Sequence, residues 1–294
     1  MAGETFLNDV SEGLDTMLAS ARTTREYPSN VTLKQADRQT LKAGTGTAWR
    51  EFQANQLSAQ DYGEQDTIDN PQQLDGSIQT LTPTLVAIHT AIGDRVALRL
   101  NAQAFATFGK SNQAAIDRKK DQDCLLVFAS AGTTLVGTGA TLSSGSIAAA
   151  VERIASNAVE PWDGPICAVL HGYGIHDIRA EAIGGIGSYP IPEGYTADAW
   201  KNGITGLAIN GAEIYRDGLI TVDSTPDARG AVFAKGPGGA IILVQGKSPW
   251  RREEYKNNVG YGLLNIYLRD EYVVGERAAG RWLFALLHDA TAPS

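Results

Sequence analysis

Two histidines and an aspartate stand close together in the segment LHGYGIHDIRAE, where they could hold a metal ion. They are His171, His176 and Asp177, with Glu181 nearby. Imidazole and carboxylate are the usual ligands of catalytic zinc. The two histidines are not one helical turn apart, as zinc proteases require, and no third strong cluster of ligands occurs. The pattern favours a core histidine and a helix-capping aspartate, with a metal-dependent enzyme as a less favoured alternative.

Other patterns that could carry chemistry are incomplete. Residues 236–239 (GPGG) lack the Lys-Ser/Thr of a phosphate-binding loop and precede a strand, so they predict a tight turn. No Gly-x-Ser-x-Gly elbow occurs. Residues 247–256 (KSPWRREEYK) interleave basic and aromatic residues that could touch nucleic-acid phosphates, but their two glutamates favour a salt-bridged contact between subunits. We therefore expect no catalytic residue, no cofactor-binding residue and no metal ligand.

Composition narrows the class of protein. A chain of 294 residues with 43% hydrophobic content can form one large domain or two smaller ones. Its net charge of −8 argues against sequence-specific DNA binding, although not against a protein that encloses nucleic acid. Cys124 and Cys167 are predicted to be buried free thiols in a reducing compartment. The start MAGETFLNDV lacks the pattern of a signal peptide, so none is expected, and no apolar run is long enough to predict a membrane-spanning helix.

The elements that must position these residues are organised around one long predicted helix, residues 94–128. No proline interrupts it, and at 1.5 Å per residue it would be roughly 50 Å long. Its centre, DRKKD at residues 117–121, is charged all round, so we do not expect that part to be fully buried. One apolar face is formed by residues that recur in steps of three, four or seven: Leu98, Ala102, Phe105, Gly109 and Ile116. The pattern predicts a spine over which other elements lie.

An N-terminal arm precedes this spine. Residues 4–26 predict an amphipathic helix that needs a partner surface, with one apolar face formed by Phe6, Leu7, Val10, Leu14, Met17, Leu18 and Ala21. Pro28 ends that helix, and residues 29–44 predict a polar, extended connector.

Residues 43–83 are polar over some forty residues, which is abnormal for a loop inside a compact domain. A disordered linker, however, would not need the large apolar and aromatic residues that this segment contains. We expect a hairpin that projects from its own domain and buries these side chains against a neighbouring molecule; a mobile surface lid is the alternative. The side chains are Trp49, Phe52, Leu57, Tyr62 and Ile68.

The second half of the chain alternates short helices and strands. Residues 82–92 predict a strand that returns from the hairpin, and Ser143 or Ser144 can cap a following helix. Residues 166–170 predict a buried strand, and Asn210-Gly211 predicts a turn between two short strands. Residues 231–234 and 240–244 predict two more strands, and long C-terminal strands are expected to pair back along the spine. These patterns predict an α/β domain over about residues 140–260.

Taken in order, these elements resemble the major capsid protein of tailed bacteriophages, which has the Hong Kong 97-type fold. TAWREFQANQLSAQDYGEQDTIDNP is similar to the extended loop of that family, TLTPTLVAIHTAIGDRVAL to its return strand and RLNAQAFATFGKSNQAAIDRKKDQDCLL to its spine helix. SGSIAAAVERIASN and PICAVLHGYGIHDI resemble the helix and strand that open the axial domain, and GITGLAINGAEIY and GAVFAKGPGGAIIL the hairpin and strand pair that follow. One departure is Gly172, where the family often has proline.

The resemblance implies an α+β, Hong Kong 97-like capsid fold with an N-terminal arm, an extended β-hairpin loop, a long spine helix and an α/β axial domain. The implied divisions are an arm over residues 1–42, an extended loop over 43–83 and a peripheral domain with the spine over 84–139. The axial domain would follow over 140–258, and residues 259–294 would be C-terminal strands returning to the peripheral domain.

The resemblance also implies a structural, non-enzymatic protein that self-assembles as pentamers and hexamers into an icosahedral shell enclosing double-stranded DNA. Its partners would be itself, a portal, separate scaffolding or decoration proteins and DNA bound without sequence specificity, with no membrane and no cofactor. It would be found in the virion and assemble in the host bacterial cytoplasm. Contacts between subunits would involve the arm and the loop, through Phe6, Val10, Leu14, Trp49, Phe52, Leu57, Tyr62 and Ile68.

Two further expectations follow from the resemblance. An encapsulin-type nanocompartment, which shares the fold but packages a cargo enzyme, is the main alternative. Some relatives cross-link covalently through a lysine in the extended loop. Here no lysine occurs between Lys42 and Lys110, so we expect no isopeptide bond of that type.

Overall fold

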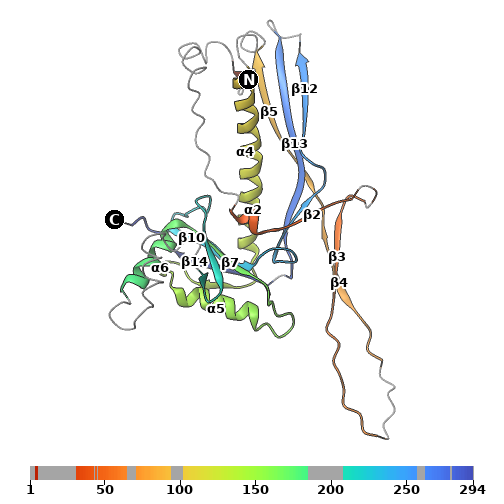
Figure 1. The fold of residues 1–294 in the computed structure, drawn as a ribbon, viewed down its shortest axis with the longest axis vertical. Helices are drawn as coiled ribbons and strands as arrows, with labels where there is room; N and C mark the ends of the chain where they lie inside the picture. Colours follow the sequence, from red (N-terminus) through yellow and green to blue (C-terminus); the bar gives the residue numbers. More distant parts are fainter. Residues whose placement is uncertain are drawn as a thin grey trace.

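The computed structural model describes residues 4–5, 31–42, 44, 46–64, 71–93, 102–184, 208–256, 262–278 and 280–293, and of residues 4–5, 102–108 and 182–184 it describes only the backbone. The described residues form two six-stranded sheets, a separate two-stranded hairpin and one long helix beside three shorter ones (Figure 1). The predicted α+β class is therefore confirmed.

The spine is α4 (Ala102–Leu126), which runs for 25 residues and tightens into a 3-10 turn, η2 (Val127–Ser130). The predicted residues 94–101 lie outside the described part of the chain. Ile116 is buried, as predicted, but Gly109 is exposed because open space surrounds the position where its Cβ would stand. No helix in the described part is both long and apolar enough to span a membrane.

The spine packs against a long mixed sheet. Its strands in hydrogen-bonding order are β1 (Glu4–Thr5), β5 (Thr84–Gly93), β13 (Leu263–Glu276), β11 (Ile241–Gln245) and β2 (Asp37–Thr40). The edge of β13 that pairs with β11 also pairs with β12 (Trp250–Lys256), over an earlier stretch. β5 is the predicted return strand, and its Thr90 hydroxyl donates to Asn112 Oδ1 of the spine over 3.2 Å.

The second sheet has the order β6 (Thr134–Val136), β14 (Leu283–Asp289), β10 (Asp227–Ala234), β7 (Ile166–Leu170), β9 (Ala212–Arg216) and β8 (Ala208–Ile209). β7 is buried at every position, as predicted. Two helices, α5 (Ser144–Ala155) and α6 (Gly172–Gly184), lie beside this sheet (Figure 1). Of the two candidate caps Ser143 is the one used, since its hydroxyl accepts the N–H of Ser146.

Local turn chemistry also agrees with the sequence. Asn210 and Gly211 both have positive φ, 48° and 85°, and join β8 to β9 as a tight hairpin. Asparagine and glycine are the residues that tolerate such values, so the predicted turn is confirmed.

The predicted strand pair around the GPGG turn does not form. β10 and β11 belong to different sheets because β7 and β14 already occupy both edges of β10. The turn carries the chain from one sheet to the other, so β11 and β12, expected in the axial domain, pair with β13. In turn β14, expected to return to the peripheral domain, pairs with β10 and β6 of the second sheet.

The connector before the hairpin is also more ordered than predicted. Residues 29–44 contain a short helix, α2 (Val31–Gln35), and β2, which pairs in parallel with β11. Leu33 is buried, and its backbone N–H donates to Asp121 Oδ1 over 2.9 Å. This contact comes from the spine, 88 residues away, so no local pattern could reveal it.

The charged centre of the spine is buried on one side. Lys119 is exposed, as expected, whereas Lys120 and Asp121 are buried. Lys120 Nζ lies 2.6 Å from Asp270 Oδ2 of β13, and this ion pair joins the spine to the long sheet. Buried charges are tolerated only when they are paired in this way.

Candidate functional site

A hairpin projects from the body of the protein beyond the lower end of the long sheet, at the lower right of Figure 1. It consists of β3 (Trp49–Ala54) and β4 (Gly76–Leu81), which pair antiparallel from Trp49↔Leu81 to Ala54↔Gly76. Neither strand joins a six-stranded sheet. Because an isolated two-stranded hairpin is marginally stable at best in water, it needs contacts at its base.

One face of the hairpin, which we call the inner face, supplies these contacts. Glu51 Oε2 accepts from Arg277 Nε over 2.7 Å, and Gln53 Nε2 donates to Glu160 Oε2 over 2.7 Å. Gln79 Nε2 donates to the carbonyl of Glu276, at the end of β13. The inner face is thus tied both to the long sheet and to the loop after α5.

The opposite face, the outer face, exposes large apolar side chains. Phe52 and Ile78 stand directly opposite each other in the ladder and are 55% and 63% exposed. Leu57 and Leu74, farther out, are 59% and 61% exposed. Apolar residues gathered on one projecting element indicate a surface that another molecule covers.

The predicted contact residues divide into three groups. Phe52, Leu57 and Tyr62 are exposed on the hairpin, and their contacts with other subunits stay a prediction. Trp49 is partly buried on the inner face, where its ring lies 5.9 Å from the Arg277 guanidinium carbon, so it belongs to the base of the hairpin. Four lie outside the described residues: Phe6, Val10, Leu14 and Ile68.

Sequence reasoning missed Ile78, Leu74 and Leu85, all large, apolar and exposed. Ile78 had a signal, since it stands between polar neighbours in a strand-like segment, where period two puts it on the face opposite Gln79. What could not be seen was its register against Phe52, which depends on how many residues the loop between the strands contains.

The four candidate metal ligands do not form one group, although His176 Nδ1 lies 3.9 Å from Asp177 Oδ1. His171 Nδ1 accepts the N–H of Tyr173 and so caps the start of α6, whereas Asp177 lies inside that helix. The predicted helix-capping aspartate is therefore wrong, because the residue before the helix is the histidine. Glu181 instead accepts from the N–H and hydroxyl of Ser144. The part of the chain that the structure describes holds no group of three or more residues suited to a metal ion.

The predicted core histidine is wrong, since His171 is only half-buried and His176 is exposed; the fully buried histidine is His288 of β14. Its ring lies against Gly174 of α6, where any Cβ would overlap it. Burial lowers the pKa of His288, and nearby His171 lowers it further, while the Leu286 carbonyl, Asp177 and Asp227 act in the opposite direction. Burial therefore favours the neutral form of this side chain, which packs between β14 and α6.

Both cysteines are buried free thiols, as predicted. Burial raises the pKa of Cys124, and the nearby Asp121 and Asp123 add to this effect. Burial likewise raises the pKa of Cys167. A thiol that stays protonated and is shielded from solvent cannot act as a nucleophile.

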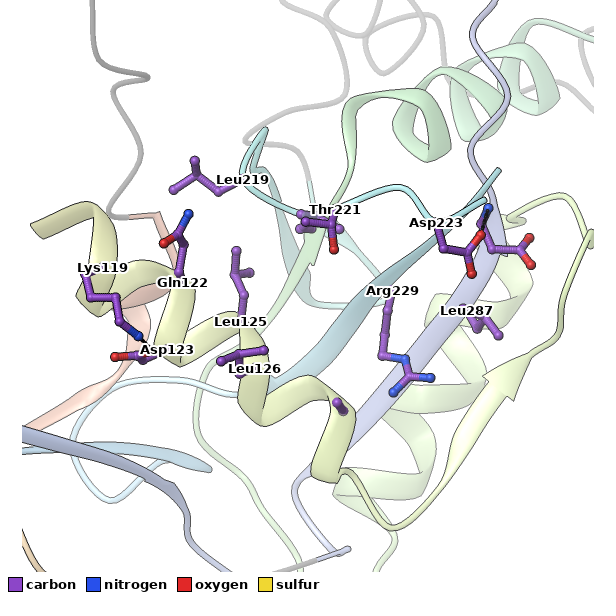
Figure 2. A pocket seen from close by; sticks show the side chains of 13 residues that line it. Lys119, Gln122, Asp123, Leu125, Leu126, Leu219, Thr221, Asp223, Arg229 and Leu287 are labelled. Atoms are coloured by element: carbon purple, nitrogen blue, oxygen red, sulfur yellow. Dashed lines mark hydrogen bonds and ion pairs between the residues drawn. The ribbon is translucent and has the colours of Figure 1, made fainter. Parts of the chain in front are cut away.

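A groove of about 520 Å³ lies between the end of the spine and the second sheet (Figure 2). Its apolar lining includes Leu126, Leu219 and Leu287, and its rim carries charged residues, among them Arg229 and Asp223. No histidine, cysteine or serine is among the described residues that line it. The groove thus offers no nucleophile paired with a histidine base.

The basic and aromatic segment is β12, at the edge of the long sheet. Within it Arg251 pairs with Glu253 on the same face of the strand, and Lys247 Nζ lies 4.2 Å from the ring centre of Trp250. Its residues are mostly exposed. The predicted contact of this segment with another subunit stays a prediction.

Comparison with known proteins identifies the fold. Neither a model of a protein family nor a curated protein matches the sequence. The capsid structure of cyanophage P-SCSP1u is similar with a TM-score of 0.70 at 10% identity, covering 96% of this chain and 95% of that one. The capsid of cyanophage Pam1 has a TM-score of 0.70 at 11% identity, covering 93% and 96%. The SrpI encapsulin of Synechococcus elongatus has a TM-score of 0.64 at 10% identity, covering 96% and 98%.

These matches extend over nearly the whole chain, 93–96% of its residues. The chain therefore has the Hong Kong 97-like capsid fold that its sequence pattern resembles. At such low identity the likeness establishes the fold alone.

Proposed function

We propose that this protein is the major capsid protein of a tailed bacteriophage, a structural subunit that assembles as pentamers and hexamers into an icosahedral shell around double-stranded DNA. The observation that carries the proposal is the outer face of the hairpin, which exposes Phe52 and Ile78 on an element held away from the body. On a capsid fold, such a face is suited to contact the next subunit.

A closed shell would gain stability from one apolar contact repeated at every subunit. Full burial of a phenylalanine or isoleucine side chain contributes about 1.5–3 kcal/mol. Since each is a little over half exposed, covering both would contribute roughly 2–4 kcal/mol per subunit. Such a contribution is modest for one contact, but a closed symmetric shell makes the same contact at every copy.

The net charge suits a shell that encloses DNA better than a protein that recognises a DNA sequence. With a net charge of −8, the chain is not expected to attract DNA by its overall charge. DNA inside the shell would be held by confinement and counterions, without sequence specificity. In this proposal a portal and separate scaffolding or decoration proteins complete the particle, which assembles in the bacterial cytoplasm and forms the virion shell. The protein has no catalytic role of its own.

The proposed domain roles follow the strand pairing. The long sheet and α4 form the peripheral domain, to which β11 and β12 belong. The second sheet with α5 and α6 forms the axial domain, and it includes β14 from the C-terminal segment. The hairpin joins the two, since its inner face contacts both.

Assembly of the protein expressed alone, and together with its neighbouring structural proteins, tests the proposal. Negative-stain microscopy and light scattering should show closed, uniform particles. The variant Phe52→Ser/Ile78→Ser should lower particle yield more than tenfold, the effect of losing over about 1.4 kcal/mol per contact. Val222→Ser, which shortens an exposed apolar side chain elsewhere, is the matched control and should assemble normally.

Two results would count against the proposal. A protein that stays monomeric beside every neighbouring structural protein is not a shell subunit. Unchanged assembly of Phe52→Ser/Ile78→Ser, with circular dichroism like that of the parent, would mean that the outer face is not the contact.

An encapsulin-type shell is the second candidate, supported by the match to the SrpI encapsulin over nearly the full length of both chains. The contents of native particles separate the two. Nuclease-protected double-stranded DNA of genome length supports the phage capsid, whereas a co-purifying cargo enzyme without such DNA supports the nanocompartment.

A further inference from the structure

One guanidinium connects three segments that are distant in the sequence. Arg277 follows the end of β13, and its Nε donates to Glu51 Oε2 of the hairpin over 2.7 Å. Its Nη1 donates to Asp37 Oδ2 of β2 over 2.9 Å and to the Gly239 carbonyl over 3.2 Å. The hairpin, the end of the N-terminal arm and the crossover turn thus meet at one side chain.

The surroundings make these contacts strong and specific. The side chain of Arg277 is largely buried, as is that of Asp37. Arginine suits such a position because its planar fork presents several donors in fixed directions, which a lysine ammonium cannot reproduce. The Trp49 ring, 5.9 Å from the guanidinium carbon, adds a cation–π contact. Trp49 and Glu51 are two residues apart, so both project from the inner face of β3 toward Arg277.

Because this contact lies at the base of the hairpin, a small rotation there moves the far end of the hairpin by a large distance. From Glu51 to Glu64 the chain can extend up to about 40 Å, at roughly 3.3 Å per residue. A rotation of about 10° at the base would therefore move the far end by about 7 Å. The other hydrogen bonds from the hairpin to the body come from side-chain amides, those of Gln53, Gln79 and Gln56, and Leu81 adds an apolar contact with Gly275 of β13.

We propose that Arg277 is the positioning residue that sets the direction of the hairpin and couples it to β2. β2 is a short strand at the edge of the long sheet, and its Asp37 shares the guanidinium with Glu51. Movement of the arm segment at this edge would therefore change how the hairpin is held. The positioning role of Arg277 concerns the single subunit; its consequence for assembly rests on the proposed capsid function.

Distance measurement on the unassembled subunit, isolated by size exclusion, tests the inference. Spin labels at Ala59→Cys in the hairpin and Ala155→Cys on α5 report the direction of the hairpin by electron–electron double resonance; both native thiols are buried. The parent should give one narrow distance distribution. Arg277→Met should shift or broaden it by about 7 Å, and Arg277→Lys should do so in part. Arg251→Gln, which removes an exposed arginine ion pair in β12, should change nothing.

Two conservative variants keep the test decisive if Arg277→Met does not fold. Glu51→Gln removes the charged partner on the hairpin and should also broaden the distribution, with little change in melting temperature. Asp37→Asn should do the same through β2. An unchanged distribution in Glu51→Gln overturns the positioning role, and an unchanged one in Asp37→Asn overturns the coupling.

These outcomes are separable from the proposed function. If the distances change as expected but neither the parent nor any variant forms particles, Arg277 positions the hairpin in a protein that is not a capsid subunit. If the parent assembles and the distances do not change in Glu51→Gln, the capsid function stands and the positioning role falls.

Discussion

The ion pair between the spine and the long sheet allows a sharp test of how the fold is held together. Lys120 of α4 and Asp270 of β13 are joined by a 2.6 Å contact, with side chains 10% and 0% exposed. Lys120 Nζ also donates to Gln245 Oε1 over 3.1 Å and lies 5.2 Å from the ring centre of Tyr272. The perturbation is Lys120→Met, which keeps the length of the side chain and removes its charge.

The expected cost follows from what remains around the carboxylate. In Lys120→Met, Asp270 Oδ1 still accepts from the Glu271 N–H over 2.8 Å and from Gln245 Nε2. Oδ2 loses the ammonium, so a buried negative charge stands without a cation. Breaking a buried pair by removing one partner costs about 3–5 kcal/mol, and we expect a loss in that range.

Two further variants separate charge from packing. Lys120→Met/Asp270→Asn removes the stranded charge, keeps an acceptor for the Glu271 N–H and should recover at least half of the lost stability. Lys119→Met is the matched control on the next residue of the helix. Its ammonium pairs with Asp123 at the surface, where such pairs contribute only about 0.3–0.5 kcal/mol.

The assay is urea unfolding of the unassembled subunit, followed by circular dichroism and tryptophan fluorescence. A loss of less than about 1 kcal/mol in Lys120→Met, the range of an exposed pair, would show that no charge is left buried without a cation. A double variant no more stable than Lys120→Met would show that the loss comes from packing.

Three more predictions concern the core and the hairpin. Burial lowers the pKa of His288, so the unfolded chain binds a proton more readily than the native chain, and stability should fall as the pH drops below about 6.5. In His288→Gln the urea midpoint should therefore depend less on pH between about pH 7.5 and pH 5. Because burial raises the pKa values of Cys124 and Cys167, a thiol reagent should label them slowly in the native protein and at once in denaturant, and fast native labelling would contradict their burial. Since residues 49–81 contain no lysine, boiled and reduced particles should run as monomers on a denaturing gel, and a ladder of higher bands would disprove this.

Elements that depend on neighbouring residues could be predicted from the sequence alone. The cap at Ser143, the buried strand over residues 166–170 and the Asn210-Gly211 turn all form where the sequence predicts them. Each rests on a hydrogen bond, an apolar run or a φ preference that involves only a few adjacent residues. The existence of the projecting hairpin was predictable for a related reason, because its composition fits neither a compact domain nor a disordered linker.

How these elements pair depends on contacts between segments that are distant in the sequence. Nothing within β10 and β11 tells that they belong to different sheets, because the outcome depends on β7 and β14 occupying both edges of β10. The same limit applied to the hairpin, where register set Ile78 beside Phe52. It applied to the N-terminal connector too, which gained a strand because β11 offered it a free edge.

The buried charges show the same division most clearly. From the sequence, Lys120 belongs to a charged centre that is not expected to be fully buried, and nothing nearby tells which of its residues leaves water. In the structure it is buried because Asp270, 150 positions later, lies opposite it on β13. Arg277 likewise gains its role from Asp37 and Glu51, which the fold brings to it from more than two hundred residues away. A lone charge cannot leave water at acceptable cost, so only the fold that supplies its partner can decide whether it is buried.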